Sequence, residues 1–302
     1  MPASYSLQGK TALITGAARG IGADAARRLA ARGARVSCVG LEPDQLERVA
    51  ADCGERELAF EADVTDRDAV ERAVAATVER TGGIDVVVSN AGIGVGGPVT
   101  RLDPDDFERV VQVNLIGAYR TVHACLPHVI ERRGYVLQIA SLAAISPYFP
   151  GFTAYSASKA GVEAFARGLG TEVAPLGVDV GVAYFSWIAT ELVTGADEEH
   201  PAFRFLRSRL KGPLGKTHPV SLAGEAIVRG VERRASVVAA PRWAVAALVL
   251  RGLIGPLTER QVSDDAAEAL RLYEEEYDRE GAEASRPVGA GGAADARASG
   301  SP

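Results

Sequence analysis

Short apolar segments alternate with longer amphipathic segments along most of the chain. Each apolar segment is four to six residues long and rich in Val, Ile and Ala, which is typical of strands buried on both faces. The longer segments repeat apolar residues at helical spacing. The pattern predicts seven strands, at 11–15, 35–39, 58–62, 84–89, 135–140, 178–183 and 237–240. It predicts helices at 21–32, 44–52, 66–80, 104–126, 155–174 and 221–233.

This alternation predicts an α/β fold: a doubly wound (Rossmann) parallel sheet of about seven strands with helices on both faces. A single dinucleotide-binding and catalytic domain is expected to span residues 1–241. Residues 191–220 interrupt the pattern with Pro and Gly and predict a small helical lid. A helical C-terminal extension is expected at 242–280. The Ala-, Gly- and Ser-rich tail at 281–302 predicts disorder, because it offers little apolar surface to bury.

Composition narrows the class of protein. The chain has 302 residues, 47% of them hydrophobic, which is enough for one large α/β core. It carries 33 basic and 39 acidic residues, a formal charge of −6, without the basic cluster that nucleic-acid binding needs. The His and Cys residues lack metal-ligand spacing, and the N-terminus lacks a secretory signal pattern. We therefore expect a cytoplasmic protein without a metal site and without a nucleic-acid partner.

One apolar segment, at 243–257, needs a separate explanation. Its fifteen residues are interrupted by Arg and Gly and are fewer than the about 20 that a transmembrane helix needs. We therefore expect no transmembrane segment. Burial at a subunit interface or a pocket wall is one interpretation, and peripheral membrane contact is the other.

A glycine-rich turn follows the first predicted strand and opens the first helix. A helix N-terminus presents free N–H groups and the positive end of the helix dipole, and glycine leaves no Cβ between these amides and a phosphate. The strand–turn–helix context is the condition that makes such a turn specific for a dinucleotide. The residues expected at the diphosphate are Gly16, Arg19, Gly20, Ile21 and Gly22.

The end of the second strand bears on the choice between NAD and NADP. An acidic residue there would hold the ribose hydroxyls and repel a 2′-phosphate, but Gly40 occupies that position. Arg19 could pair with a 2′-phosphate through its planar guanidinium, so NADP(H) is the preferred cofactor. NAD(H) stays an alternative, because Leu41 adds no cation and Glu42 could turn toward the ribose. Arg19 would then be a solvated loop residue.

Tyr155 and Lys159 stand four residues apart on a predicted helix, so their side chains share one face. A free tyrosine has a pKa of about 10 and is a weak base at neutral pH. A neighbouring ammonium should lower that pKa and suit the phenol to acid–base catalysis. Because such pairs also occur by chance on helix surfaces, the interpretation depends on the residues around them.

Further candidate residues lie where predicted strands end, and parallel sheets bind ligands at that edge. Ser141 ends the fifth strand and could hydrogen-bond a substrate oxygen beside Tyr155. The sequence Asn90-Ala91-Gly92 ends the fourth strand, where a tight turn lets the backbone approach a cofactor. Asp63 and Val64 end the third strand and are placed to meet the adenine.

Asn114 lies inside a long predicted helix, although asparagine is a poor helix former that competes for backbone hydrogen bonds. This local misfit suggests a role such as holding a water.

Together the motifs Thr-Gly-x-x-x-Gly-Ile-Gly, Asn-Ala-Gly, Asn114, Ser141 and Tyr-x-x-x-Lys, in this order, resemble the short-chain dehydrogenase/reductase family. The resemblance covers about residues 7–190. It implies an NAD(P)-dependent oxidoreductase acting on CH–OH or C=O groups.

The resemblance also implies a role for each catalytic residue. Tyr155 would be the general acid in reduction and the general base in oxidation, and Ser141 would position and polarise the carbonyl. Lys159 would bind the nicotinamide ribose and lower the tyrosine pKa, while Asn114 would hold a water that links Lys159 to solvent. The remaining cofactor contacts implied are Asn90 and Gly92 at the ribose, and Ile188 and Thr190 at the carboxamide and diphosphate.

The sequence departs from the family after the sixth strand, where Phe185-Ser186 stands in place of the usual Pro-Gly. Two or three of the aromatic residues Tyr184, Phe185 and Trp187 are therefore expected at the nicotinamide floor, where they would make the pocket narrow and apolar. The expected substrate is a hydrophobic ketone, aldehyde or secondary alcohol. The residues expected to line its pocket are Leu142, Tyr148, Phe149 and Trp187.

Two alternatives stay open, one for the role of the lid arginines and one for the function of the protein. Arg204, Arg207 and Arg209 form either a solvated helix face or an anion site for a carboxylate or a carrier-linked thioester. The rival to an enzyme is a non-catalytic NAD(P)-binding sensor or scaffold, although binding alone would not need Tyr155. The resemblance further implies a homodimer or homotetramer that pairs through the helices at 104–126 and 155–174.

Overall fold

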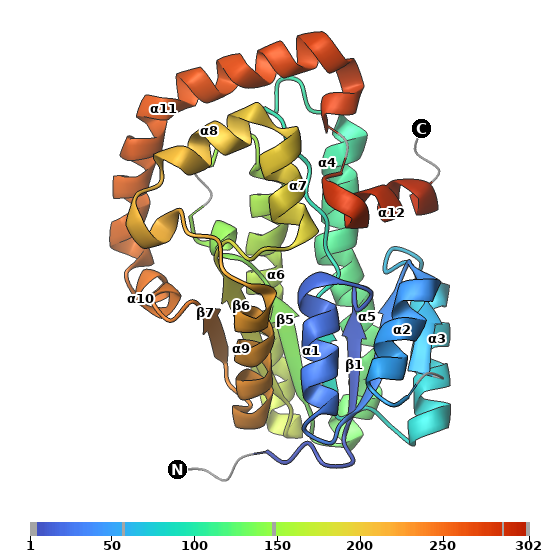
Figure 1. Cartoon of the computed structure of the whole chain (residues 1–302). Coiled ribbons are helices and arrows are strands. Elements are labelled where there is room, and N and C mark those ends of the chain that lie inside the picture. Colours follow the sequence, from blue (N-terminus) through green and yellow to red (C-terminus); the bar gives the residue numbers. More distant parts are fainter. Residues whose placement is uncertain (1–4, 56–57, 147–148, 286, 300–302) are drawn as a thin grey trace.

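The computed structural model describes residues 5–55, 58–146, 149–285 and 287–299. Within them the predicted strands form one parallel sheet in the order β3-β2-β1-β4-β5-β6-β7 (Figure 1). This arrangement confirms the predicted doubly wound α/β fold. The strands are β1 (Thr11–Thr15), β2 (Arg35–Gly40), β3 (Ala59–Glu61), β4 (Val86–Ser89), β5 (Tyr135–Ile139), β6 (Asp179–Phe185) and β7 (Val237–Ala240).

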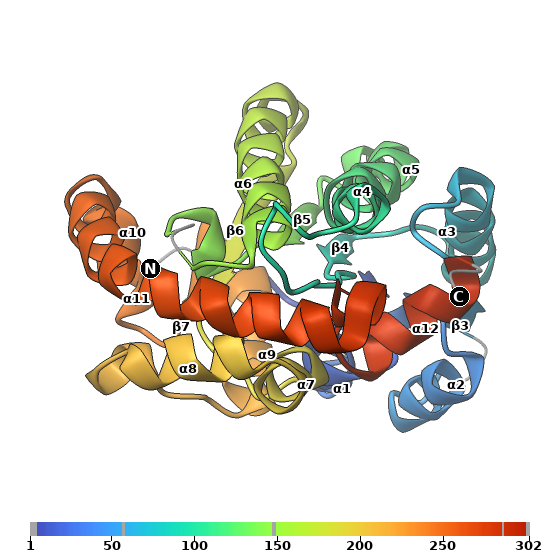
Figure 2. The same ribbon diagram turned by 90° about the horizontal axis from the view of Figure 1, so that it is seen from above.

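Helices cover both faces of the sheet (Figure 2). One face carries α1 (Gly20–Ala30), α2 (Pro43–Asp52) and α9 (Val220–Arg233). The other carries α3 (Arg67–Thr81), α4 (Pro104–Val111), α5 (Gly117–Glu131) and α6 (Thr153–Val173). The sequence predicts one continuous helix over 104–126, whereas the structure divides it by a π-helical turn at Gln112–Ile116.

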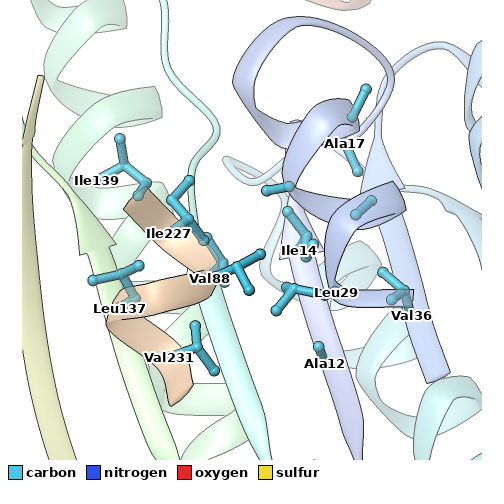
Figure 3. Close-up of a cluster of buried hydrophobic side chains, with 14 of the residues drawn as sticks. Ala12, Ile14, Ala17, Leu29, Val36, Val88, Leu137, Ile139, Ile227 and Val231 are labelled. Carbon is cyan, nitrogen blue, oxygen red and sulfur yellow. The ribbon is translucent and has the colours of Figure 1, made fainter. Parts of the chain in front are cut away.

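The core consists of two apolar layers, because successive residues of a buried strand point to opposite faces. Ile14 of β1 lies in the layer that contains Leu29 of α1 and Ile227 of α9 (Figure 3). The neighbouring Leu13 points to the opposite layer, with Val122 of α5. Each large aliphatic side chain contributes about 1.5–3 kcal/mol when fully buried, which is why these strands are apolar along their whole length.

The carboxyl edge of the sheet is covered by the lid and by the C-terminal helices. The lid contains α7 (Glu191–Glu199) and α8 (Pro201–Arg209), and the extension contains α10 (Ala244–Val249) and α11 (Arg251–Glu280). Helix α11 packs against α8 and crosses above the strand ends (Figure 2). The sequence predicts disorder over 281–302, but the structure forms α12 (Gly289–Ser299), which packs against α7 and buries Ala294.

The apolar segment at 243–257 forms α10 and the beginning of α11. Val245 and Val249 of α10 are exposed. Of the helices in the described parts of the chain, none is both long enough and apolar enough to span a membrane. The two interpretations of this segment, a subunit interface and peripheral membrane contact, stay predictions.

Candidate active site

A cavity of about 240 Å³ lies beyond the carboxyl ends of the strands, next to the point where the strand order reverses between β1 and β4. Open parallel sheets bind ligands at this position. The glycine turn forms one end of the cavity, and the ends of β2, β3, β4, β5 and β6 contribute its walls. Its lining includes most of the predicted cofactor residues, namely Gly16, Arg19, Gly20, Ile21, Asp63, Val64, Asn90, Ala91, Gly92, Tyr155, Lys159, Ile188 and Thr190.

The glycine turn has the conformation that a diphosphate requires. Gly16 and Gly20 have φ values of 64° and 53°, in the left-handed region that favours glycine. The side chain of Arg19 makes no capping hydrogen bond, so the first N–H groups of α1 are not satisfied by a cap at the cavity. Asn90 Nδ2 donates to the Thr15 oxygen at 3.0 Å and holds the turn against β4. These residues fit a diphosphate on the N-terminus of α1.

Gly22 has a different role from the one predicted. It is not among the residues that line the cavity. A Cβ at this position would lie 2.2 Å from the Gly16 oxygen and 2.7 Å from Asn90 Nδ2. Gly22 therefore allows the helix to pack closely against its own turn, which fixes the shape of the phosphate site.

Charged side chains surround the adenosine end of the cavity. Arg19 forms ion pairs with both Glu42 and Glu191. Asp63 accepts hydrogen bonds from the Thr65 amide at 2.7 Å and from Arg109 Nη2 at 3.0 Å. Burial opposes the ionisation of Asp63, but these hydrogen bonds prevail and lower its pKa. Arg109 lies in the middle of a predicted helix, and no sequence signal distinguishes it from a surface arginine.

Ser141, Tyr155 and Lys159 line the same cavity as the glycine turn. Ser141 follows β5, accepts a hydrogen bond from the Ala143 amide at 3.1 Å and hydrogen-bonds Tyr155. Lys159 Nζ donates to the Ile139 oxygen at 2.9 Å and lies 5.7 Å from the centre of the Tyr155 ring. The helical spacing thus brings the predicted acid–base pair to the end of β5, beside the predicted serine.

The electrostatics of this pair differ from the sequence prediction. Burial raises the pKa of Tyr155, and the hydrogen bond with Ser141 offsets that effect only in part. Burial also lowers the pKa of Lys159 to about 8. The expectation that Lys159 lowers the tyrosine pKa is therefore wrong for the protein by itself. The amine lies over the ring and donates to the Ile139 backbone oxygen, and Lys159 is buried while Tyr155 is half-buried.

Asn114 lies on the π-helical turn and is buried. Its Oδ1 accepts from the Ile93 amide at 2.8 Å, and its Nδ2 donates to the Ile93 oxygen at 3.0 Å and to Ser158 Oγ at 2.9 Å. A Cβ on Gly92 would lie 3.0 Å from Asn114 Oδ1 and 3.2 Å from Lys159 Nζ, so Gly92 separates the two side chains. The misfit seen in the sequence corresponds to a π turn, a feature that is frequent at functional sites.

Aromatic side chains gather next to Tyr155. Phe149 and Trp187, both predicted for the substrate pocket, pack with Phe152 and Phe203 at centroid separations of 4.9–5.8 Å. This aromatic cluster (Phe149, Phe152, Trp187, Phe203) contacts Tyr155. It borders the cavity rather than lining it.

The other aromatic predictions have mixed outcomes. Phe185 lines the cavity together with Ser186, as the departure from Pro-Gly suggests. The expectation for Tyr184 is wrong: this residue is fully buried, and its hydroxyl accepts from Arg167 Nη2 at 2.9 Å. Successive residues of β6 point to opposite faces, so Tyr184 and Phe185 cannot both face the nicotinamide. Leu142 packs in the same apolar cluster as Tyr184, away from the cavity, and Tyr148 lies outside the described residues.

The lid arginines are bound within the chain. Arg207 pairs with Asp197 and stacks on the ring of Trp187, and Arg209 pairs with Asp265 of α11. Arg204 donates to backbone oxygens of α7. These contacts hold the lid together, so neither a free anion site nor a purely solvated face describes them.

One part of the cavity wall was missed by sequence reasoning altogether. Val288, Gly291, Gly292, Ala294 and Asp295, from the segment predicted to be disordered, line the same cavity as the glycine turn. The low complexity of this segment gave no signal for docking.

Comparison with known proteins agrees with this geometry. The family model described as short chain dehydrogenase matches residues 10–201. The chain therefore belongs to the short-chain dehydrogenase family and is an NAD(P)-dependent oxidoreductase of that class.

Particular relatives differ in what they act on. The chain is 32% identical over 218 residues to the 3-oxoacyl-(acyl-carrier-protein) reductase of Haemophilus influenzae, covering 72% of this chain and 89% of the relative. It is 36% identical over 171 residues to the serine 3-dehydrogenase of Agrobacterium fabrum, covering 56% and 68%. A solved 3-ketoacyl-(acyl-carrier-protein) reductase from Brucella melitensis, complexed with NADH, superposes with a TM-score of 0.69 at 30% identity, covering 78% and 98%.

Proposed function

We propose that this protein transfers a hydride between a nicotinamide cofactor and a hydrophobic ketone, aldehyde or secondary alcohol, with Tyr155 as the general acid and base. One observation carries the proposal. Ser141, Tyr155 and Lys159 line the same cavity as the glycine turn. A dinucleotide with its diphosphate on the N-terminus of α1 would bring its nicotinamide within reach of these three residues.

The bound nicotinamide supplies or accepts the hydride. In reduction, the hydroxyls of Ser141 and Tyr155 bind the carbonyl oxygen, and Tyr155 gives its proton to that oxygen as the carbon gains the hydride. The phenolate that remains is stabilised by the ammonium of Lys159, which is present below pH 8. Reversing these steps gives oxidation, with Tyr155 as the base.

Burial of Tyr155 is consistent with this role. The raised pKa keeps the phenol protonated at neutral pH, as a general acid requires. Positive charge brought near its oxygen would lower that pKa and favour proton release. The reaction thus depends on the nicotinamide and Lys159 together, rather than on Lys159 alone.

The proposed substrate class follows from the aromatic cluster. Phe149 and Trp187 are the partly exposed rings of this cluster, and they border the cavity beside Tyr155 with no free charge, since Arg207 is paired with Asp197. Such a surface favours an apolar or aromatic carbonyl compound over a charged acid. The named relatives act on different substrates, so their names do not decide the substrate of this chain.

NADP(H) is the proposed cofactor, and Arg19 is the residue on which this depends. A 2′-phosphate at the end of β2 would take the place of Glu191, the more exposed of the two carboxylates on Arg19. We expect Arg19→Ala to weaken the binding of NADPH at least 10-fold more than the binding of NADH, because a charge-assisted hydrogen bond to the 2′-phosphate is lost. Equal losses for the two cofactors, measured by titration of their fluorescence, would refute the preference.

The decisive test of catalysis is Tyr155→Phe, which removes only the hydroxyl. We expect kcat to fall about 100- to 10,000-fold, the usual contribution of a general acid or base. The Kd for dinucleotide should stay within about 2-fold. The exposed Tyr119, changed in the same way, is the matched control. Unchanged turnover in Tyr155→Phe would remove the assigned role. A wild-type protein that binds dinucleotide yet reduces no member of a carbonyl panel would instead be the non-catalytic sensor.

A homodimer or homotetramer is the proposed assembly. Helix α6 exposes Ala157, Ala160 and Ala164 on its outer surface, and these small side chains permit a second copy of the helix to approach closely. Light scattering coupled to size-exclusion chromatography tests this expectation. Substitution of Ala160 by Glu should then produce a monomer.

A further inference from the structure

The C-terminal segment (residues 288–299) contains α12, which lies beside α7 beyond the carboxyl ends of the strands (Figures 1 and 2). It also lines the adenosine end of the cavity. Asp295 and Gly292 of this segment line the cavity together with Glu42 and Asp63. These positions are more than two hundred residues apart in the sequence. The cavity is therefore closed on this side by a segment that follows the whole catalytic domain.

The C-terminal segment is docked by close backbone contacts. The Val288 amide donates to the Gly94 oxygen at 2.9 Å, and the Val288 side chain is buried against the aromatic cluster. On α7, a Cβ at Gly195 would lie 3.1 Å from the Gly289 Cα. The fit between the segment and α7 thus depends on the absence of a side chain at Gly195.

A charged latch fixes the far end of the segment. The Asp295 side chain is 3% exposed and accepts two hydrogen bonds from Arg109. Arg109 Nε donates one at 2.9 Å, and Arg109 Nη2 donates the other at 2.6 Å. The same guanidinium binds Asp63 and Thr65 at the adenosine wall. Bidentate pairs of this kind are among the stronger polar contacts in proteins. Asp295 is therefore connected to the predicted adenine site through Arg109.

Two physical arguments indicate that this contact opens. With the C-terminal segment docked, the cavity measures about 240 Å³, whereas pockets for drug-sized ligands measure about 300–1000 Å³ and a dinucleotide is larger than most such ligands. Helix α12 has eleven residues and contains Gly289, Gly291 and Gly292, so it is a marginal helix on its own and depends on its docking contacts. Segments that are marginal on their own and depend on docking contacts open by local unfolding.

We propose that the C-terminal segment is a gate that excludes the dinucleotide when closed, with Asp295 and Arg109 as its latch. The proposal rests on the assignment of this cavity to a nicotinamide dinucleotide. If only the open form binds, the apparent Kd equals the intrinsic Kd divided by the open fraction. Weakening the latch then strengthens binding, which is opposite to the effect of removing an ordinary binding residue.

The test compares two variants that open the gate by different means. Asp295→Asn removes the charge of the latch, and Gly195→Val forces the segment away from α7 without a change of charge. For each we expect the association rate constant of NADPH and NADH, measured by stopped-flow fluorescence, to rise about 10-fold, the effect of one charged hydrogen bond on the gate equilibrium. The Kd should fall by the same factor, and the dissociation rate constant should not change.

Gly168→Val is the matched control, because a Cβ at Gly168 would meet no atom within 4 Å. Hydrogen exchange should show faster exchange of residues 288–299 in both gate variants and not in the control. Tighter binding in Asp295→Asn but not in Gly195→Val would show an effect of charge alone and would overturn the gate. Unchanged rates in both variants would also overturn it. Failure of every form to bind either cofactor would instead refute the assignment of the cavity.

Discussion

Replacement of Asn114 by Ala tests whether this residue holds the wall of the active site. The change removes the acceptor of the Ile93 amide and the donor to the Ile93 backbone oxygen. Ser158 Oγ retains its hydrogen bond to the backbone oxygen of Tyr155. Ile93 is 5% exposed, so two backbone groups lose their partner in a buried site. Each such group costs about 1–3 kcal/mol, which gives a loss of about 2–6 kcal/mol in the free energy of unfolding.

Thermal unfolding followed by circular dichroism measures this loss. One kcal/mol corresponds to about 2–4 °C in a domain of this size, so we expect Tm to fall by about 10 °C. Gln112→Ala is the control, since Gln112 is exposed on the same π turn and its replacement should change stability by less than about 0.5 kcal/mol. A loss below 1 kcal/mol in Asn114→Ala would refute the reasoning, because the Ile93 groups would then have another partner.

Two further predictions concern the cofactor site. Gly22→Ala places a methyl group 2.2 Å from the Gly16 backbone oxygen, so dinucleotide titration should show a Kd that is weaker by at least 10-fold. The control variant Gly168→Ala should bind the dinucleotide normally. Normal binding in Gly22→Ala would contradict the packing argument. The pKa of Lys159 is lowered to about 8, so the ammonium is present below that pH and dinucleotide affinity should decrease as pH rises through it. Lys159→Arg should abolish this pH dependence of dinucleotide affinity, because arginine does not titrate in that range. A pH dependence that persists in the variant would belong to another group.

The sequence by itself determined the class of fold and the family, and it supplied the residues on which the proposed chemistry rests. Buried strands in a parallel sheet are apolar along their whole length, so the seven strands could be located from composition within a few residues. The glycine turn and the Tyr155–Lys159 spacing are equally local, because a turn or a single helix face fixes their geometry. Even the π turn left a local trace, the asparagine in a helix.

Only the tertiary structure decided how the groups act on one another. Burial raises the pKa of Tyr155 where the neighbouring Lys159 alone predicted a lower value, since desolvation depends on everything packed around a side chain. The contact between Asp295 and Arg109 joins residues 186 positions apart. The helix that carries Asp295 has only eleven residues, three of them Gly, so it is marginal on its own and depends on the surface on which it docks. Such long-range contacts leave no periodic pattern in a single sequence.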